Sequence, residues 1–317
     1  MKSVLTVKLP DSKFLLEFEN QLDPAYPEKS KIPVNILGYG EISSVFEIGR
    51  IGNLAFKRMP PFDSLATLEA YRAVLEEYCE LLRSLGIRLV PYSFFDCRNN
   101  DGEHILYIVQ PKLDAARIGH RYLQQCSEKK MQTALSSLFL ALCKIWRYNR
   151  ENGDKLLLGL DAQISNWIFE DGKTTPAFLD YSTPFLRKDG RDMLNTEIFL
   201  KSMPFYLIHI VRRFFLQEIL DRYYDLRQVL IDLIANFYKE GLAGKISAAI
   251  HHINNLSKHE APDLHIAPLA EAEIENYYRS DALMWKLLLN FRRFDRFLKT
   301  KILQQKYNFI LPGKIDR

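Results

Sequence analysis

The sequence predicts an α+β protein of two parts, a small antiparallel sheet in residues 1–111 and a larger helical part in residues 112–317. Short β-branched and aromatic runs separated by turn residues fill the first third of the chain. Apolar residues at helical spacing dominate from about residue 121 onward. The chain has 317 residues, 47% hydrophobic and 26% charged, which is typical of a globular protein large enough for two packed lobes.

The first part is predicted to hold about five strands and one helix. Glycines divide residues 34–57 into two or three strands, and two more strands are expected at 87–95 and 104–112, separated by a polar turn. A helix is predicted over 64–85, with Gly86 as its stop. Its apolar residues recur at spacings of three and four: Leu68, Tyr71, Leu75, Tyr78 and Leu82.

The second part is predicted to be helical over 129–149 and over long stretches of 194–300, with short strands returning at 156–186. The apolar stretch 204–220 needs a test as a membrane segment. Because His209, Arg212 and Arg213 interrupt it and a span needs about 20 largely apolar residues, we expect a buried helix and no membrane span.

Charge and cysteine content exclude several classes of partner. The net charge of +4 comes from 43 basic and 39 acidic residues in even mixture, so no long-range field marks a nucleic-acid or membrane partner, and we expect no nucleic acid to bind. The four cysteines have neither zinc-site nor disulfide-framework spacing, and the N-terminus has no apolar core of signal-peptide length. We therefore expect reduced thiols in a cytoplasmic protein.

The first candidate site is the segment GYGEISSV, from Gly38 to Val45, followed by a strand that ends at Lys57. Glycines let backbone amides approach phosphates, and a lysine on the adjoining strand supplies positive charge. A plain β-turn explains the glycines about equally well, and a lysine that ends a strand is more often just solvated. This segment alone therefore leaves both interpretations open.

A second candidate combines Asp161, Asn166 and Asp180. The pattern is D-x-x-x-x-N, a short strand, an Asp-Gly turn at 171–172, a second short strand and an aspartate at its end. Such a hairpin brings Asn166 and Asp180 together, and their oxygens beside phosphates form the kind of hard-oxygen site that Mg²⁺ prefers. Asp161 is left to orient a hydroxyl nucleophile. The alternative, a turn cap and two loop residues, does not explain why all three coincide with one hairpin.

The order and spacing of these residues resemble the protein-kinase-like superfamily over residues 34–187, and more nearly its small-molecule branch, such as the aminoglycoside and choline kinases. The resemblance implies a two-lobed fold that binds ATP and Mg²⁺, with Asp161 as the catalytic aspartate and Asn166 and Asp180 as magnesium ligands. It assigns nucleotide contacts to a phosphate-covering loop, a lysine and a hinge: Gly38, Gly40, Ser43 and Val45, then Lys57, then Gln110 and Leu113.

Several positions depart from that family pattern. Ser43 replaces the third glycine of the loop, Gly159-Leu160 precede Asp161 in place of His-Arg or His-Gly, and Asp180 is followed by Tyr-Ser in place of Phe-Gly. We expect Glu77 of the 64–85 helix to pair with Lys57, in preference to three other glutamates of that helix: Glu69, Glu76 and Glu80. If Tyr71 or Tyr78 takes the inward position, the lysine lacks this partner.

The function expected from these residues is transfer of a phosphoryl group from ATP to a hydroxyl of a small-molecule acceptor. A nucleotide-binding pseudokinase or scaffold module is the main alternative, and nucleotidyl transfer by the same pocket is a third. The acceptor-binding region, about 190–317, carries no motif that identifies the acceptor. Within it, residues 285–301 form a basic amphipathic helix whose Leu and Phe stripe we expect to pack on the helical part, with arginines able to meet an acidic partner.

Overall fold

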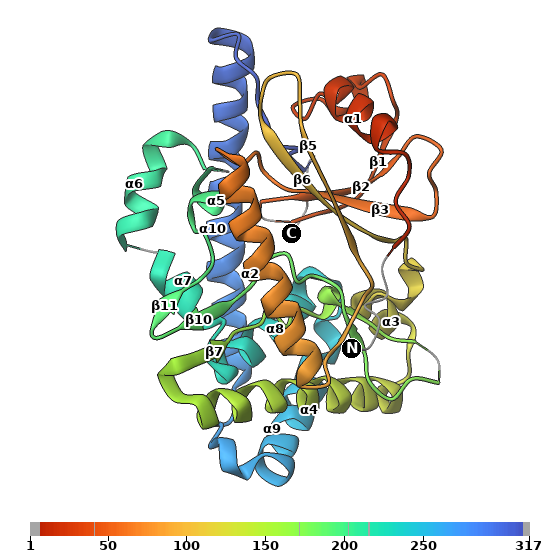
Figure 1. Cartoon of the computed structure of the whole chain (residues 1–317). Coiled ribbons are helices and arrows are strands. Elements are labelled where there is room, and N and C mark those ends of the chain that lie inside the picture. The colour runs from red at the N-terminus through yellow and green to blue at the C-terminus, as the bar shows by residue number, and fades with distance from the viewer. Residues whose placement is uncertain (1–6, 41, 171, 202, 215, 313–317) are drawn as a thin grey trace.

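The computed structural model describes residues 7–312 except Glu41, Asp171, Ser202 and Phe215. A five-stranded sheet lies at one end of the molecule and the helices α4 (Glu128–Asn152) and α9 (Ile246–Glu260) lie at the other (Figure 1). The helix α10 (Glu271–Phe297) runs alongside both parts. The predicted α+β class, with a strand-rich first third and a helix-rich remainder, is confirmed.

The sheet consists of five antiparallel strands in the spatial order β1-β2-β3-β6-β5. The bounds are as follows: β1 Val34–Tyr39, β2 Ser44–Ile48, β3 Leu54–Arg58, β5 Ser93–Arg98 and β6 His104–Pro111. In the register of the first three strands, Gly38 lies opposite Val45 and Val45 lies opposite Lys57. The predicted number of strands and their approximate positions are therefore confirmed.

Two helices cover the two faces of this sheet. The helix α2 (Leu65–Ser84) begins at the N-cap Ser64, whose hydroxyl accepts a hydrogen bond from the Thr67 amide at 3.2 Å. It packs in one core with residues 106 and 108 of β6, whereas α1 (Ser12–Gln21) packs in a second core with residues 105, 107 and 109. Side chains alternate across a strand, so the two helices lie on opposite faces. The helix α1 was not predicted from the sequence.

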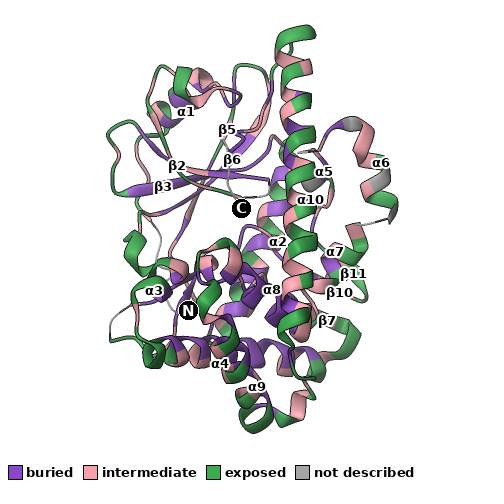
Figure 2. Ribbon diagram, turned by 180° about the vertical axis from the view of Figure 1, so that it is seen from behind, coloured by how far each residue is buried: buried purple, intermediate pink, exposed green. Residues whose placement is uncertain are grey.

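The helical part is centred on α4, which packs against α9 and α8 (Leu226–Lys239), while α8 also packs along α10. The shorter helices are α3 Gly119–Gln125, α5 Glu197–Lys201, α6 Phe205–Phe214 and α7 Leu216–Arg222. Figure 2 shows that buried residues concentrate on α4 and α8, inside this part. The helix predicted over 129–149 is confirmed by α4.

Short strands return in the chain between α4 and α5, as predicted for residues 156–186. Their bounds are β7 Leu156–Leu158, β8 Trp167–Ile168, β9 Ala177–Phe178, β10 Leu186–Lys188 and β11 Arg191–Asp192. The strands β8 and β9 form an antiparallel hairpin, and β4 (Arg88–Leu89) pairs in parallel with β9. Since β4 comes just before β5 of the five-stranded sheet, its pairing with β9 ties the hairpin to that sheet.

The apolar stretch 204–220 differs from its prediction as one buried helix. It forms parts of α6 and α7, and most of its described side chains are half-buried or exposed, with Leu220 buried. His209, Arg212 and Arg213 fall on these helices and give them a polar side, which favours partial exposure. No helix in the described parts of the chain is long and apolar enough to cross a membrane.

The last described residues return to the sheet. After α10, residues 298–302 form a π-helical turn and the chain then runs back along the first part. Ile310 joins the core on the α1 face of the sheet, and its carbonyl oxygen lies 3.3 Å from the Ser44 hydroxyl. The C-terminal segment therefore packs beside the strand that follows the glycine-rich loop.

Candidate nucleotide and metal site

The hairpin β8–β9 places Asn166 and Asp180 at adjacent points. The Leu179 amide donates a hydrogen bond to the Asn166 carbonyl oxygen at 2.8 Å, so the residue before Asp180 is fixed to Asn166. Gly172, in the predicted turn, has a φ of +74°, a conformation that glycine adopts without strain, while Asp171 lies outside the described residues. The predicted convergence of the two ends of the hairpin is confirmed.

Lys57 joins the sheet to this hairpin. Its Nζ lies 2.5 Å from Asp180 Oδ1 and 2.7 Å from Ser182 Oγ, and the lysine is only 7% exposed. Burial by itself raises the pKa of Asp180, but the Lys57 charge and hydrogen bonds from Lys57 and Ser182 outweigh it and lower the pKa below its ordinary value. Asp180 is therefore held ionised beside a cation.

Asp161 lies before Asn166 in the same loop but has a different environment. Its Oδ1 accepts a hydrogen bond from the Gln163 amide at 3.1 Å, and its backbone oxygen accepts one from Asn166 Nδ2 at 3.3 Å. Burial raises the pKa of Asp161 to about 6, the Gln163 amide opposes this shift, and the charge of Asp180 adds to it. Such a carboxylate titrates close to neutral pH, which suits a group that exchanges a proton or orients a hydroxyl.

The glycine-rich segment lies beside Lys57 in the sheet, because Gly38 of β1 is opposite Val45 of β2, and Val45 is opposite Lys57 of β3. The Gly40 amide donates to the Ser43 carbonyl oxygen at 2.9 Å, and Glu41 lies outside the described residues. A Cβ at Gly40 would lie 3.0 Å from Ser43 Oγ, whereas one at Gly38 would meet nothing within 4 Å. A side chain at position 40 would therefore be tight against Ser43, and Gly38 borders open space.

Two other glycines let the Asp161 loop pack closely, and sequence reasoning did not identify one of them. A Cβ on Gly119 would lie 2.1 Å from the Ile164 carbonyl oxygen, and one on Gly159 would lie 2.7 Å from that of Tyr223. Tyr78 also donates its hydroxyl to the Gly159 carbonyl oxygen at 2.9 Å. Any side chain at either glycine would displace the loop that carries Asp161.

The predicted hinge residues lie where the sheet meets the hairpin. Gln110 donates through Nε2 to the Leu179 carbonyl oxygen at 3.0 Å and to the Tyr181 hydroxyl at 2.6 Å. Leu113 packs in a small apolar cluster with Val90, Ile168 and Ala177. The Gln110 side chain therefore fixes the position of the Asp180 loop, which is a positioning role that the sequence did not indicate.

The predicted pairing of Lys57 with Glu77 is wrong. Glu77 lies 2.6 Å from Lys188 Nζ, in an ion pair that is half-buried. The inward side of α2 carries Tyr71 and Tyr78, which are buried, and Tyr71 donates to the Ser182 carbonyl oxygen at 2.6 Å. Tyr71 and Tyr78 continue the spacing of the apolar residues of α2, so their side chains face the core. Glu77 falls outside that spacing and points away from the core.

The oxygen atoms at the hairpin fit a Mg²⁺ ion. Among the described residues, Asn166 Oδ1 and Asp180 Oδ2 accept no hydrogen bond, so each has free lone pairs. Both are hard donors of the kind that Mg²⁺ prefers, and phosphate oxygens and water ordinarily supply its other ligands. No group of three or more His, Cys, Asp or Glu side chains in the described residues is arranged as a metal site.

A buried polar cluster on α8 lies beside this loop and was missed by the sequence reasoning. Asp232 accepts hydrogen bonds from Asn236 Nδ2 at 3.1 Å and from the Tyr277 hydroxyl at 3.0 Å. Burial raises its pKa to about 8, and the charge of Asp161 contributes. Lys239 of the same helix lies 3.4 Å from the Gln163 side-chain oxygen. The signal in the sequence was an Asp and an Asn four residues apart within an apolar helix.

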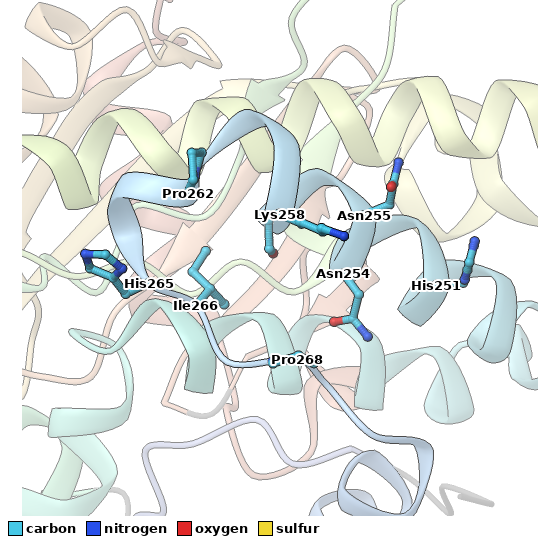
Figure 3. Close-up of a pocket in the computed structure, with 9 residues that line it drawn as sticks. His251, Asn254, Asn255, Lys258, Pro262, His265, Ile266 and Pro268 are labelled. Carbon is cyan, nitrogen blue, oxygen red and sulfur yellow. The ribbon is translucent and has the colours of Figure 1, made fainter.

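A cavity of about 500 Å³ lies elsewhere, on α9 and the loop that follows it (Figure 3). Three cationic or titratable side chains border it, namely His251, Lys258 and His265. Asn254 is also at its border but is engaged with the Leu269 backbone at 3.0 Å and 2.8 Å. Since α9 lies at the end of the molecule opposite the sheet (Figure 1), this cavity is separate from the hairpin site.

Comparison with known proteins adds a family and no activity. A search of the curated proteins finds no match for this sequence. The family that does match is described as a family of unknown function, DUF6206, and the match extends over residues 18–296. Since this range covers most of the chain, the chain belongs to the DUF6206 family, and the match includes the candidate site from Gly38 to Asp180.

Proposed function

We propose that this protein binds ATP with Mg²⁺ and transfers the terminal phosphoryl group to a hydroxyl of a small-molecule acceptor. The observation that carries the proposal is the contact of Lys57 Nζ with Asp180 Oδ1 at 2.5 Å. It joins the third strand of the sheet to the hairpin that holds Asn166, with Asp161 at the start of the same loop. A cation, two oxygen ligands and a titratable carboxylate are thereby gathered on one side of the sheet.

Each of these residues has a distinct role in the proposal. Lys57 would hold the phosphates of the nucleotide, and Asn166 and Asp180 would hold Mg²⁺, which neutralises developing charge during transfer. Asp161, with a pKa of about 6, is mostly ionised at neutral pH and would accept a hydrogen bond from the acceptor hydroxyl. Positioning and electrostatics supply most of the rate in such reactions.

The proposed architecture is the two-lobed, kinase-like fold. It is supported by the antiparallel sheet with α2 on one face and by the helical part that begins after Pro111. The chain after Asp180 is short and paired in β10 and β11 before α5 begins at Glu197. A long activation segment has no place there, which favours a small-molecule acceptor over a regulated protein kinase.

We place the protein in the cytoplasm on the basis of its thiols. All four cysteines are free, and Cys79 and Cys143 are buried in the helical core. Burial raises the pKa of each of these two thiols to about 12, so both are unreactive near neutral pH. Cysteines that serve only as packing residues fit a reducing compartment.

The test is ATP turnover by the purified chain with Mg²⁺ and a panel of hydroxyl compounds, with ADP release as the readout. We expect turnover in the wild type and its loss in Asp161→Ala and Asp180→Ala. Mass spectrometry of the product should show an added phosphoryl group, whereas an added AMP would indicate nucleotidyl transfer. Full turnover by either variant would exclude the proposed site.

A nucleotide-binding module without catalysis is the second candidate. It is favoured by the surroundings of Lys57. The lysine pairs with Asp180 and not with a glutamate of α2, whose inward side carries Tyr71 and Tyr78. This candidate predicts a rise in melting temperature with ATP and Mg²⁺ but no ADP release with any acceptor. The two measurements together separate binding from catalysis.

A further inference from the structure

The helix α10 and the residues directly after it carry a stripe of exposed apolar side chains, contrary to the expectation that the Leu and Phe residues of this region pack on the helical part. We call this set the α10 stripe: Leu283, Met284, Leu287, Phe291, Phe294, Phe297, Ile302 and Leu303, each between 38% and 59% exposed. The opposite side of the helix is the one that packs, through Leu289, Arg292 and Asp295. The helix has apolar residues on two sides, and only one is covered.

The stripe is broad and continuous along the outside of the molecule. At about 100° per residue, its members from 283 to 297 fall within an arc of about 140° of the helix surface. Figure 2 shows α10 at the front of that view, exposed along much of its length. Tyr206 of α6 packs edge-on to Phe291, with 6.1 Å between ring centroids, and marks one border of the stripe.

The charges next to the stripe are positive. Residues 283–303, all of which the structure describes, contain six basic residues and one acid, Asp295. Of these, Arg292 is buried on the packed side of the helix, and Lys299 lies 3.0 Å from Asp295, which is 4% exposed. Lys286 and Lys301 are exposed beside the apolar side chains, and Arg293 is half-buried. Whatever covers the stripe therefore meets cations around an apolar surface.

From this pattern we infer that the α10 stripe is a docking surface for an anionic membrane surface, on which the helix lies parallel to the bilayer plane. Phe and Leu side chains enter the boundary between headgroups and acyl chains, and Lys286 and Lys301 meet anionic headgroups. The arc is wider than the narrow seam by which one helix pairs with another.

The inference is independent of the proposed catalysis and is tested by flotation of the full chain with vesicles. We expect binding to phosphatidylcholine vesicles that contain phosphatidylserine, weakening with salt, and little binding to phosphatidylcholine alone. Phe294→Ser with Phe297→Ser should abolish binding. Lys286→Gln with Lys301→Gln should weaken it about thirtyfold, because each cation near an anionic surface accounts for about a fivefold change.

The matched control is Leu65→Ser with Leu140→Ser, which removes two leucines that are 46% and 40% exposed on α2 and α4 and should leave binding unchanged. Unchanged melting temperatures establish that each variant is folded, and the lysine variants keep the test valid if the phenylalanine pair unfolds. Failure of the wild type to bind anionic vesicles would overturn the inference. Equal binding to neutral vesicles, or self-association in sedimentation that Phe294→Ser abolishes, would also overturn it.

Discussion

Two neighbouring residues of β3, Lys57 and Arg58, each form an ion pair, on opposite faces of the sheet. Lys57 reaches Asp180 in the hairpin, whereas Arg58 reaches Glu19 of α1 through two hydrogen bonds of 2.9 Å and 2.8 Å. Glu19 also accepts a hydrogen bond from the Tyr107 hydroxyl, and Arg58 donates to the Asn308 carbonyl oxygen at 3.1 Å. The second pair therefore links α1, two strands and the C-terminal segment.

The two pairs differ in their access to solvent. The side chains of Arg58 and Glu19 are 4% and 1% exposed, whereas those of Lys57 and Asp180 are 9% and 32% exposed, so the pair of Lys57 and Asp180 is open to solvent on the Asp180 side. Burial raises the pKa of Glu19, but the charge of Arg58 and hydrogen bonds from Arg58 and Tyr107 lower it overall. A buried bidentate pair is fixed, whereas an accessible single contact is able to exchange its lysine for a phosphate ligand. The same strand thus carries one structural pair and one that we assign to function.

The largest expected effect is on turnover, after substitution in the accessible pair. Lys57→Met should lower ATP turnover a hundredfold to a thousandfold, about the effect of removing one preorganised electrostatic contact. Because water is able to reach Asp180 once the lysine is gone, the free energy of unfolding should fall by only about 1 kcal/mol. Steady-state kinetics with urea denaturation measures both, and wild-type turnover in Lys57→Met would contradict the functional assignment.

The buried pair should show the opposite behaviour. Glu19→Ala leaves Arg58 as an uncompensated buried charge and should lower the free energy of unfolding by about 3–5 kcal/mol. Turnover at a temperature where the variant is folded should stay within a few-fold of wild type. Because the folded-state pKa of Glu19 is lowered, this stability is present above the unfolded pKa and is lost as the pH falls. Denaturation at several pH values measures this stability. A fall in the free energy of unfolding of less than about 1 kcal/mol in Glu19→Ala would contradict the proposed difference between the two ion pairs.

The pH dependence of turnover should report Asp161 and not Asp180. Below about pH 6, kcat/KM should fall about tenfold per pH unit, because protonation of Asp161 removes its capacity to accept a hydrogen bond. Asp180, whose pKa is lowered, stays ionised over this range. Residual turnover by Asp161→Asn should show no such decline. A wild-type rate that is flat between pH 7 and about pH 5 would rule out the assigned role.

The smallest effect is expected at Glu77. Its pair with Lys188 lies at the surface, with both side chains between 35% and 41% exposed, so Glu77→Ala should change the free energy of unfolding by less than about 1 kcal/mol and turnover by less than about twofold. A double-mutant cycle with Lys188→Ala should give a similarly small coupling energy. A large loss of turnover in Glu77→Ala would indicate that the glutamate moves to Lys57 when nucleotide binds.

Much of the sheet and the hairpin was predictable because their signals are local. Turn residues, alternating runs and the spacing of Asn166 and Asp180 fix which segments pair, and β8 and β9 pair as expected. The partner of Lys57 was not predictable, since several glutamates on α2 have similar local surroundings and only tertiary packing places Tyr71 and Tyr78 inward.

The same limit explains the errors in the helical part. The sequence of α10 is apolar on two sides, and periodicity does not say which side is covered by α8. Asp232 was missed because an Asp and an Asn four residues apart in an apolar helix have no recognisable spacing to Asp161, which is distant in the sequence. Long-range contacts, not local patterns, decide both features.

The most direct test of the nucleotide site is calorimetric titration of ATP into the wild-type chain and into Asp180→Asn, each with and without Mg²⁺. If Asp180 is a magnesium ligand beside Lys57, the wild type should bind ATP at least about tenfold more tightly with Mg²⁺ than without it, and Asp180→Asn should lose that difference. Equal magnesium enhancement in both proteins, or no ATP binding by the wild type, would contradict the assignment of this site.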